Sequence, residues 1–596
     1  MRVENRYYVN VQADSVKELG AYRDFMINHN CRSEVIMGSF WRCLLMVLGF
    51  CVFTMRVCQS EDNVSRSRFK FLIYTSADDG SHHMQLASIA KSLVGSGHSV
   101  TFLLSSSCTK WLHADDAHLF HFIVYRSLYT QEDRREISRR FSISVMNGDL
   151  RSLLGIIKLT LRGLRDPRQR MLLEFPINEC DALLGDDDAA RRMEAERFDL
   201  LIGDDLTFCI PLLAEKLGIG FVLYSASPMK PAKLGLLYGV PSQSTYIPER
   251  QLGLSSDMTL PQRVANTAMS YLYTVLFYEQ ACHYSPLQRK YGIGPAASVV
   301  ELIGRAELWI FSMNLVLDYP RPLQPNLILI AVPTIGVQAD LKFGYFLQVP
   351  PDQQVFVNSA DQEGVVLFSL GTHMNEMPAA QADVFARGLA KISQKVLWHF
   401  TGNTSHLALG NNTKVVPWIP MRHFMEHPNV KAILCHGGSG IVQEAAWFGL
   451  PIVGVPLFGD HFDNLIRAVD KGFAVSLDLF LLTEDNLQQA VQKVINEPTF
   501  RENAKKLSEI LRDEVQLPAD KAAGWITHVA RFGGKHLRPR VLDQGLVERY
   551  QLDVYAVLLL GGAVTLAIGW LACRCCFRAL RYRCGEWGQA RKVKLN

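Results

Sequence analysis

The chain has 596 residues, too many for one hydrophobic core, so we expect two domains. Hydrophobic residues make up 48% of it and charged residues 20%, a balance that excludes a largely disordered chain. The formal net charge of +4 argues against a nucleic-acid-binding protein.

The first 60 residues contain an upstream extension and a predicted secretion signal. Arg42 precedes the apolar run 43–53, and small residues near Ser60 fit a cleavage site. The run is shorter than a membrane-spanning helix. Residues 1–36 look unlike the start of a signal peptide, so we expect Met37 to be the true start and the signal to cover residues 37–60.

The predicted N-terminal domain covers residues 61–327 and alternates strands with helices. In chain order, we expect strand 69–74, helix 84–93, strand 100–104, strand 198–203 and helix 208–217. This alternation is typical of a Rossmann-like domain with a parallel sheet. Such sheets bind ligands at the carboxyl ends of their strands, where His82 lies in the loop 76–82 and Asp204 follows another strand.

Two further stretches of this domain allow more than one interpretation. Residues 186–188 are three aspartates that resemble a metal-binding DxD motif, but their polar surroundings favour a solvated turn. Residues 261–291 predict a helix rich in large apolar side chains such as Tyr271 and Leu276. That face could line an acceptor pocket, touch a membrane or belong to the core, and we favour the core for most of its residues.

A proline-containing connector, residues 328–360, leads to a second predicted Rossmann-like domain, residues 361–518. The expected strands are 365–370, 396–400, 432–435 and 452–456, and the expected helices are 378–392, 441–448, 484–496 and 500–511. The first of these strands ends at Gly371 and Thr372. Residues 519–552 follow as a helical return segment.

The stretch 418–472 carries the most informative pattern. Between strand 432–435 and helix 441–448 lies the turn His436-Gly437-Gly438-Ser439-Gly440. Free N–H groups and the helix dipole make such a glycine turn an anion site, usually for phosphate.

Side chains on either side of this turn fit the rest of a nucleotide sugar. Trp418 offers a flat face to a base. Glu444 lies about two helical turns after His436 and can accept hydrogen bonds from two ribose hydroxyls. Asp460 and His461 follow the next strand, where a sugar on the second phosphate would lie.

The C-terminal region predicts a membrane anchor. The domain 553–573 is a transmembrane helix, since residues 554–573 carry no charge, and the basic tail 574–596 is then cytosolic. The body is therefore expected in the lumen as a type I protein. Lys592 and Lys594 resemble an endoplasmic reticulum retrieval signal, and the sequons at Asn63, Asn403 and Asn411 agree with that location.

Five cysteines of the body are scattered and form neither a CxxC metal pair nor a disulfide framework. We expect them to be small buried hydrophobic side chains: Cys108, Cys180, Cys209, Cys282 and Cys435. At the membrane edge, Cys573, Cys575 and Cys576 are candidates for palmitoylation or simply interfacial residues.

The order of these motifs resembles the donor signature of the family 1 UDP-sugar glycosyltransferases, specifically the membrane-bound UDP-glucuronosyltransferases of animals. The matching elements are W-x-P at Trp418, H-G-G at His436, E-A-x-x-x-G-x-P at Glu444 and L-F-x-D-x-x-x-N at Leu457. The resemblance implies a GT-B fold, in which two Rossmann-like domains face a cleft. It also implies a UDP-sugar donor, a lipophilic acceptor, inverting transfer, and neither a metal nor another cofactor.

The resemblance further implies a role for each matching residue. His82 matches the histidine that takes the acceptor's proton, and Asp204 matches the aspartate that pairs with it. His83 and Asp205 are the second choices. The donor-binding residues implied are Gly371, Thr372, Trp418, His436, Gly437, Gly438, Ser439, Gly440, Glu444, Asp460 and His461.

Three positions depart from the family pattern. Met421 and His461 stand where glutamine is usual, and Gly440 stands where asparagine is usual. The pair Asp460-His461 resembles the ceramide galactosyltransferase branch and leans toward galactose or another hexose over glucuronate.

We therefore expect a hexosyltransferase that moves glucuronate, galactose or glucose onto a hydroxyl of a lipophilic acceptor. The departures keep a second reading open, a non-catalytic lipid- or glycan-binding membrane protein on a transferase scaffold. Retention of His82, Asp204, Glu444 and Asp460 argues against it. The sequence also leaves a homo-oligomer open.

Overall fold

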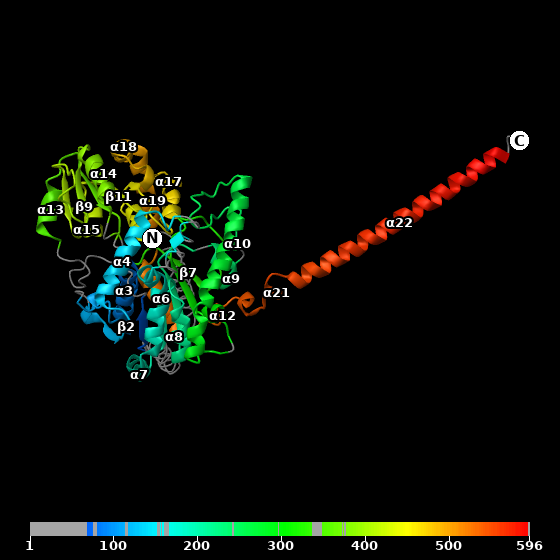
Figure 1. Cartoon of the computed structure of the whole chain (residues 1–596), viewed down its shortest axis with the longest axis horizontal. Coiled ribbons are helices and arrows are strands. Elements are labelled where there is room, and N and C mark those ends of the chain that lie inside the picture. The colour runs from blue at the N-terminus through cyan, green and yellow to red at the C-terminus, as the bar shows by residue number, and fades with distance from the viewer. Residues whose placement is uncertain are drawn as a thin grey trace, which may run out of the picture. The chain divides into compact units, whose positions relative to one another are not determined.

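The computed structural model describes residues 68–75, 80–113, 117–151, 155, 158–159, 162, 166–229, 231–240, 243–295, 297–335, 349–371, 374 and 377–593. The chain divides into two units, Met1–Arg68 and Phe69–Asn596, and the second is described below (Figure 1). The predicted extension and signal, Asn63, loop residues 76–79, Thr372, connector residues 336–348 and Lys594 lie outside the described residues.

A seven-stranded parallel sheet forms the first domain, in the order β3-β2-β1-β4-β5-β6-β7. Its strands are β1 Lys70–Tyr74, β2 Ser99–Ser105, β3 His121–Tyr125, β4 Leu200–Asp204, β5 Gly220–Ser225, β6 Leu308–Ser312 and β7 Leu327–Ile330. Ile73 of β1 pairs with Phe102 of β2 and with Ile202 of β4. The strand order reverses between β1 and β4, so the carboxyl ends of these two strands flank the switch point where such sheets bind ligands.

Helices cover both faces of this sheet, as the buried apolar side chains of its strands require. They are α3 Gly80–Gly95, α4 Gln131–Met146, α6 Pro167–Gly185, α7 Asp187–Glu196, α8 Cys209–Leu217, α9 Pro231–Tyr238, α10 Leu260–Cys282, α11 Ser285–Lys290 and α12 Val299–Ile303. The acidic run is the start of α7, because an oxygen of Asp186 accepts hydrogen bonds from the N–H groups of Asp188 and Ala189. The run was predicted as a solvated turn, but Asp187 and Asp188 form the first turn of a helix, which Asp186 caps.

Two predicted boundaries were wrong. Helix α3 begins at Gly80, so His82 lies in the first helical turn and not in a loop. The helix includes this turn because His83 faces inward and stacks on Trp111, with the ring centroids 4.1 Å apart. At the other end of the domain, Leu327–Ile330 is the edge strand β7, paired with β6, although residues from 328 onward were predicted as connector.

The second domain contains a six-stranded parallel sheet in the order β10-β9-β8-β11-β12-β13. Its strands are β8 Val365–Ser369, β9 Lys395–His399, β10 Thr413–Val416, β11 Val430–Cys435, β12 Ile452–Gly454 and β13 Ala474–Ser476. Its helices are α13 Pro351–Asn358, α14 Ala379–Ala390, α15 Met421–Met425, α16 Ser439–Trp447, α17 His461–Asp470, α18 Glu484–Asn496 and α19 Pro498–Arg512. The strand order reverses between β8 and β11, and the glycine turn lies at the end of β11.

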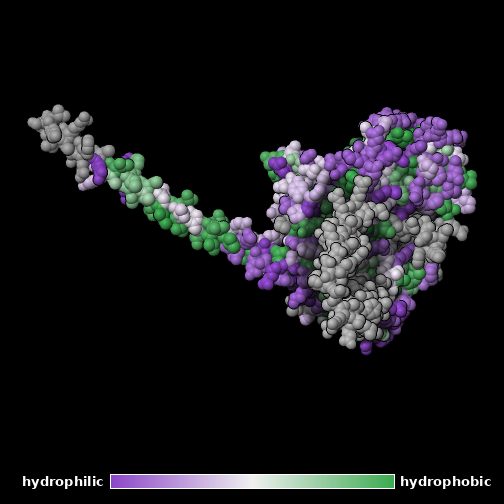
Figure 2. Space-filling view, turned by 180° about the vertical axis from the view of Figure 1, so that it is seen from behind, coloured by the Kyte–Doolittle hydropathy of each residue, from purple (hydrophilic) through white to green (hydrophobic). Residues whose placement is uncertain are grey.

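After the second domain, the chain returns to the first. Helix α20, Pro518–Phe532, buries Ala522, Ile526 and Val529 in the same core as β1 and β2. The chain then runs through α21, Leu546–Arg549, into α22, Leu552–Val593. The segment Leu552–Arg583 of α22 is long and apolar enough to cross a membrane, and Figure 2 shows it as a hydrophobic band with polar surface at its start.

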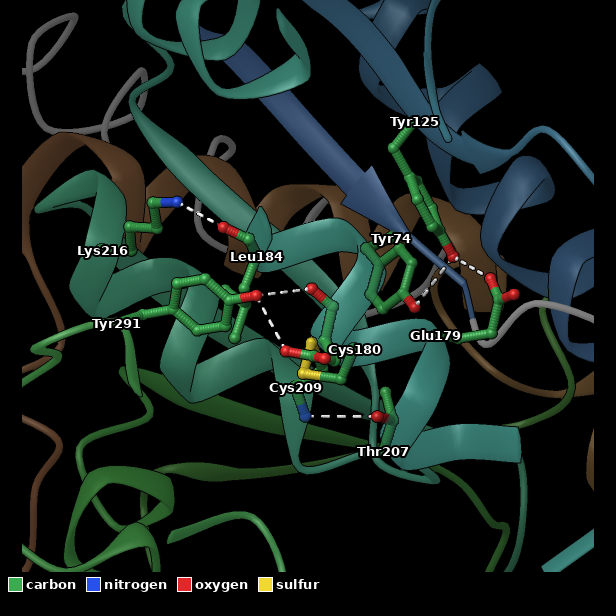
Figure 3. Close-up of a disulfide and its surroundings, with 10 residues drawn as sticks. Tyr74, Tyr125, Glu179, Cys180, Leu184, Thr207, Cys209, Lys216 and Tyr291 are labelled. Atoms are coloured by element: carbon green, nitrogen blue, oxygen red, sulfur yellow. Dashed lines mark hydrogen bonds between the residues drawn. A yellow bond between two sulfur atoms is a disulfide. The ribbon is translucent and has the colours of Figure 1, made fainter. Parts of the chain in front are cut away.

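A disulfide between Cys180 and Cys209 joins α6 to the start of α8 (Figure 3). The expectation that the body cysteines are free hydrophobic side chains was therefore wrong for this pair. Both lie in the core of the first domain. The cross-link restrains the start of α8, in the segment that follows β4. The N–H of Cys209 restrains the same segment by donating a hydrogen bond to the hydroxyl of Thr207 at 3.1 Å.

Candidate active site

His82 and Asp204 meet at the switch point of the first sheet. Nδ1 of His82 lies 2.6 Å from Oδ2 of Asp204, and the other carboxylate oxygen accepts the N–H of Leu206 at 3.1 Å. The Asp204 side chain is fully buried, while that of His82 is 14% exposed. Since a carboxylate accepts, Nδ1 carries the proton, and Nε2 of the neutral ring keeps its lone pair. This arrangement can hold a general base in one tautomer.

The two second-choice residues are engaged elsewhere. His83 is buried in the first domain, and burial lowers the pKa of its imidazole to about 3. Its Nδ1 lies 3.5 Å from the hydroxyl of Thr75. Asp205 forms an ion pair with Lys233 at 3.5 Å. The geometry therefore favours His82 and Asp204 over both alternatives.

The glycine turn after β11 is built around the ring of His436. A Cβ at Gly371 would lie 2.8 Å from Cε1 of this ring, and a Cβ at Gly438 would lie 2.6 Å from its Nε2. Both distances are shorter than side-chain carbons tolerate, and Gly371 also has a φ of +90°, so glycine is required at both positions. The ends of β8 and β11 thus come together as the sheet order predicts.

Asn464 joins this turn to Asp460. Its side-chain N–H groups donate to the carbonyl of Gly437 and to Oδ2 of Asp460, each at 3.0 Å. Gly437 has a φ of +84°. Asn464 belongs to the L-F-x-D-x-x-x-N motif, yet the hydrogen bonds by which it joins the glycine turn to Asp460 were not identified from the sequence.

Glu444 already has partners in this structure. Its Oε1 accepts the hydroxyl of Thr334 at 2.7 Å and lies 3.9 Å from Nε of Arg422. Burial raises the pKa of the Glu444 carboxyl. Thr334 lies in the predicted connector, and its hydroxyl binds the carboxylate in the manner expected of a ribose hydroxyl.

Trp418 and His461, both predicted to bind the donor, have different surroundings. Trp418 follows β10, is 36% exposed, and meets the ring of His399 edge-on. His461 is buried, with its ring centroid 4.5 Å from that of His436 and 4.4 Å from that of Phe458. It therefore supports His436 and the turn by packing.

His82 and the glycine turn lie on neighbouring elements. A Cβ at Gly440, near the start of α16, would lie 3.6 Å from the side-chain amide nitrogen of Gln85. Gln85 is one turn beyond His82 on α3. His82 and the start of the donor helix thus lie on the same side of the molecule. Ser439, the first residue of α16, is also buried.

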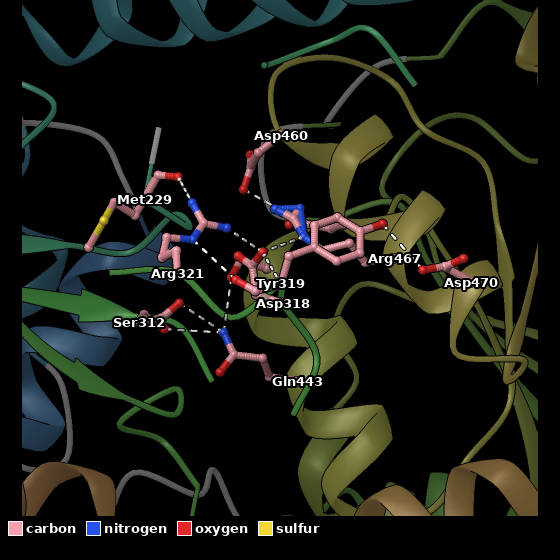
Figure 4. Close-up of polar contacts among 11 residues, drawn as sticks. Met229, Ser312, Asp318, Tyr319, Arg321, Gln443, Asp460, Arg467 and Asp470 are labelled. Atoms are coloured by element: carbon pink, nitrogen blue, oxygen red, sulfur yellow. Dashed lines mark hydrogen bonds and ion pairs between the residues drawn. The ribbon is translucent and has the colours of Figure 1, made fainter. Parts of the chain in front are cut away.

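Gln443, which the sequence analysis did not identify, holds the two domains together at this point. Its amide donates to the carbonyl of Ser312 and to the hydroxyl of Ser439, each at 3.0 Å, and accepts the N–H of Val332 at 2.9 Å. Figure 4 shows it beside a second group of contacts between the domains.

In that second group, Asp318 lies between two arginines. Its Oδ1 accepts from Arg321 at 2.6 Å and lies 3.3 Å from Nε of Arg467 on α17 (Figure 4). A cavity of about 30 Å³ adjoins these side chains, and Arg250 and Asp460 are also among its lining residues. The wall behind Asp460 is therefore charged and shared by both domains.

Comparison with known proteins identifies the family. The UDP-glucoronosyl and UDP-glucosyl transferase family matches residues 70–586. UDP-glucuronosyltransferase 2A2 of Homo sapiens is 31% identical over 525 residues, which cover 87% of this chain and 92% of that protein. The 2-hydroxyacylsphingosine 1-beta-galactosyltransferase of Homo sapiens is 32% identical over 487 residues, which cover 81% and 84%.

The fold is also that of solved glycosyltransferases. The crystal structure of the glycotransferase of kitacinnamycin superposes with a TM-score of 0.52, covering 77% of this chain and 98% of that chain at 17% identity, a likeness of fold alone. Both the resemblance and the GT-B fold class predicted from the sequence are thus confirmed. By its matched length and its relatives, this chain belongs to the UDP-glucoronosyl and UDP-glucosyl transferase family.

Proposed function

We propose that this chain transfers a hexose from a UDP-sugar to a hydroxyl group of a lipophilic acceptor, with inversion at the anomeric carbon. The observation that carries the proposal is the 2.6 Å contact between His82 and the buried Asp204, opposite the start of the donor helix. The name of one relative, a 2-hydroxyacylsphingosine galactosyltransferase, supports a lipid alcohol as the class of acceptor.

In this mechanism, Nε2 of His82 receives the proton of the acceptor hydroxyl as its oxygen attacks the anomeric carbon. The Asp204 carboxylate stabilises the positive charge that then forms on the ring. The bond between the anomeric carbon and the UDP oxygen breaks on the opposite side, so an α-linked donor yields a β-glycoside. The N–H groups at the start of α16, together with His436, stabilise the departing diphosphate.

The donor-binding roles follow the order along the second domain. Trp418 binds the base, Glu444 the ribose, the turn from Gly437 to Gly440 the diphosphate, and Asp460 the hexose. Glu444 must exchange the Thr334 hydroxyl for a ribose hydroxyl, or bind the ribose through its second oxygen. The leaning toward galactose or another hexose over glucuronate rests on the pair Asp460-His461 in the sequence.

We further propose that the body is lumenal in the endoplasmic reticulum, anchored by α22 with a cytosolic tail. The disulfide supports an oxidising compartment. Asn403 and Asn411 are both exposed, as glycan acceptors in a lumenal body must be.

The test is UDP release by the full-length chain, with UDP-galactose, UDP-glucose and UDP-glucuronate each paired with a panel of lipophilic alcohols and phenols. Replacing His82 by alanine should lower turnover by about 10²–10⁴-fold, because the general base is lost, while UDP binding stays nearly unchanged. His406→Ala, at an exposed histidine after β9, is the matched control. Full turnover by the His82 variant would refute its assigned role, and no UDP release with any pair would favour the non-catalytic reading.

A further inference from the structure

One face of α10 is apolar and exposed along its whole length. Its exposed residues recur at alternating intervals of four and three, as one stripe of a helix does. The stripe consists of Val264, Ala268, Tyr271, Val275, Tyr278 and Cys282. Tyr271 is 73% exposed and Val275 64% exposed. At a rise of about 1.5 Å per residue, the stripe is about 27 Å long.

This face is unusual for a helix in contact with water. Leu260 and Leu276 extend the stripe, and the charged residues of α10 are limited to Arg263 and Glu279. Exposed helical faces of soluble domains are normally polar, and a contiguous apolar face marks a binding surface. The opposite face of α10 packs against the rest of the first domain, and Asn266, Ser270 and Phe277 on that face are buried.

The chain ties α10 to the place where the anchor begins. The hydroxyl of Thr274 donates to the carbonyl of Ala232 on α9 at 3.1 Å, and the ammonium of Lys233 lies over the ring of Phe277. The residues before the anchor also contact α9, because a Cβ at Gly235 would lie 3.7 Å from the hydroxyl of Tyr550. Val541 also packs against Gly239.

Tyr550, which contacts α9, lies only a few residues before the membrane-spanning part of α22. The apolar part of α22 begins at Val554, four residues after Tyr550. Four residues span about 6 Å as a helix and at most about 14 Å fully extended. Helix α9, which meets the end of the Tyr550 side chain, is therefore held near the start of the apolar span, and α10 packs on α9.

We propose that the α10 stripe docks on the surface of the same lipid bilayer that α22 crosses, as a second point of membrane contact. An apolar helical face next to a membrane binds by burying its side chains at the boundary of headgroups and acyl chains. One acidic and one basic residue on α10 give it no net charge, so anionic lipid is not required. Because α9 and α10 belong to the first domain, docking also holds the acceptor side of the enzyme against the lipid phase.

The experiment uses the full-length chain in phosphatidylcholine vesicles, with p-benzoylphenylalanine in place of Val275. Illumination should attach lipid to α10, detected as a lipid-adducted α10 peptide by mass spectrometry. The matched control places the same photoreactive residue at Val355 on α13, a valine that is 66% exposed against 64% for Val275. Lipid adducts at position 275 should exceed those at 355 by about tenfold if the stripe is in the bilayer boundary.

A second variant separates docking from mere proximity. Val275→Glu, with the photoreactive residue moved to Tyr271, should reduce lipid adducts about fivefold, because a carboxylate opposes burial at the lipid boundary. Equal adduct yields at positions 275 and 355 would overturn the proposal. A cross-linked dimer in place of lipid adducts at 275 would also overturn it and assign the stripe to a second copy of the chain. The readout does not depend on transferase activity.

Discussion

At the scale of single residues, Asp463 is a buried carboxylate at the boundary between the domains. It lies on α17 and accepts the N–H of Gln251 from the first domain, at 3.1 and 3.3 Å to its two oxygens. Burial raises the pKa of its carboxyl to about 7, although Arg467 opposes this rise. The folded protein therefore holds this proton more tightly than the unfolded chain does.

The sign of the resulting pH dependence follows from that difference. Asp463 adds stability below the unfolded pKa of about 3.9, and this contribution is lost as pH rises to about 7. The amide of the Asp463→Asn variant cannot ionise, so the variant should keep the stability that the wild type loses. The difference in Tm between the variant and the wild type should therefore grow between pH 5 and pH 7.5. We expect a difference on the order of a few kcal/mol at pH 7.5. Thermal unfolding across this range tests it.

The control for this comparison is Asp520→Asn, at an exposed carboxylate on α20. Its unfolding curves should follow the wild type at every pH. Parallel pH profiles for the wild type and Asp463→Asn would contradict the assignment of the transition to Asp463.

Contacts between site residues could be predicted from the sequence only where a motif fixes both a residue and its place on the sheet. His82 and Asp204 follow strands that flank a switch point, so their meeting was foreseeable once the strands were recognised. The contacts of Gln443 and Thr334 were not, because each depends on how closely the two domains approach. Sequence patterns report periodicity within elements, and they do not report distances between domains.

At the scale of elements, the link between α6 and α8 should contribute directly to stability. The disulfide closes a separation of 29 residues. A loop of this size is worth about 3.6 kcal/mol through the entropy of the unfolded chain. Replacing both Cys180 and Cys209 by alanine should lower the free energy of unfolding by about that amount.

Denaturant titrations with and without dithiothreitol check this prediction. The reductant should lower the stability of the wild type toward that of the double variant and leave the variant unchanged. Cys282→Ser, at an exposed free cysteine, should behave as the wild type in both conditions. Identical stability of the wild type and the double variant without reductant would contradict it.

The strands and most helices were predictable because buried parallel strands are continuous apolar runs, and because apolar residues recur with the helical period along a helix. The disulfide was not, since two cysteines among five scattered ones give no spacing signature. The start of α3 was also missed: the residues from Gly80 to His83 are polar, and it is the inward contact of His83 with Trp111 that makes them helical.

At the scale of the whole molecule, the proposed orientation predicts glycans on one loop of the second domain. Asn403 and Asn411 are exposed between β9 and β10, and each begins a glycosylation sequon. The chain made in animal cells should therefore lose mass on treatment with peptide:N-glycosidase. Asn403→Gln and Asn411→Gln should each remove one glycan.

A finer control changes only the hydroxyl of the first sequon. Ser405→Ala should remove the same glycan as Asn403→Gln, while the backbone N–H of residue 405 keeps its bond to the Asn403 side chain. A chain in membranes with neither site occupied would contradict a lumenal body.

The packing of α20 also sets an order for assembly during synthesis. Ala522, Ala523, Ile526 and Val529 complete a core whose other buried members lie between residues 71 and 330. The helix contacts α3, β6 and β7, so this side of the first sheet stays bare while the whole second domain is being translated. A chain terminated before residue 518 would therefore lack the α20 part of the core of its first domain.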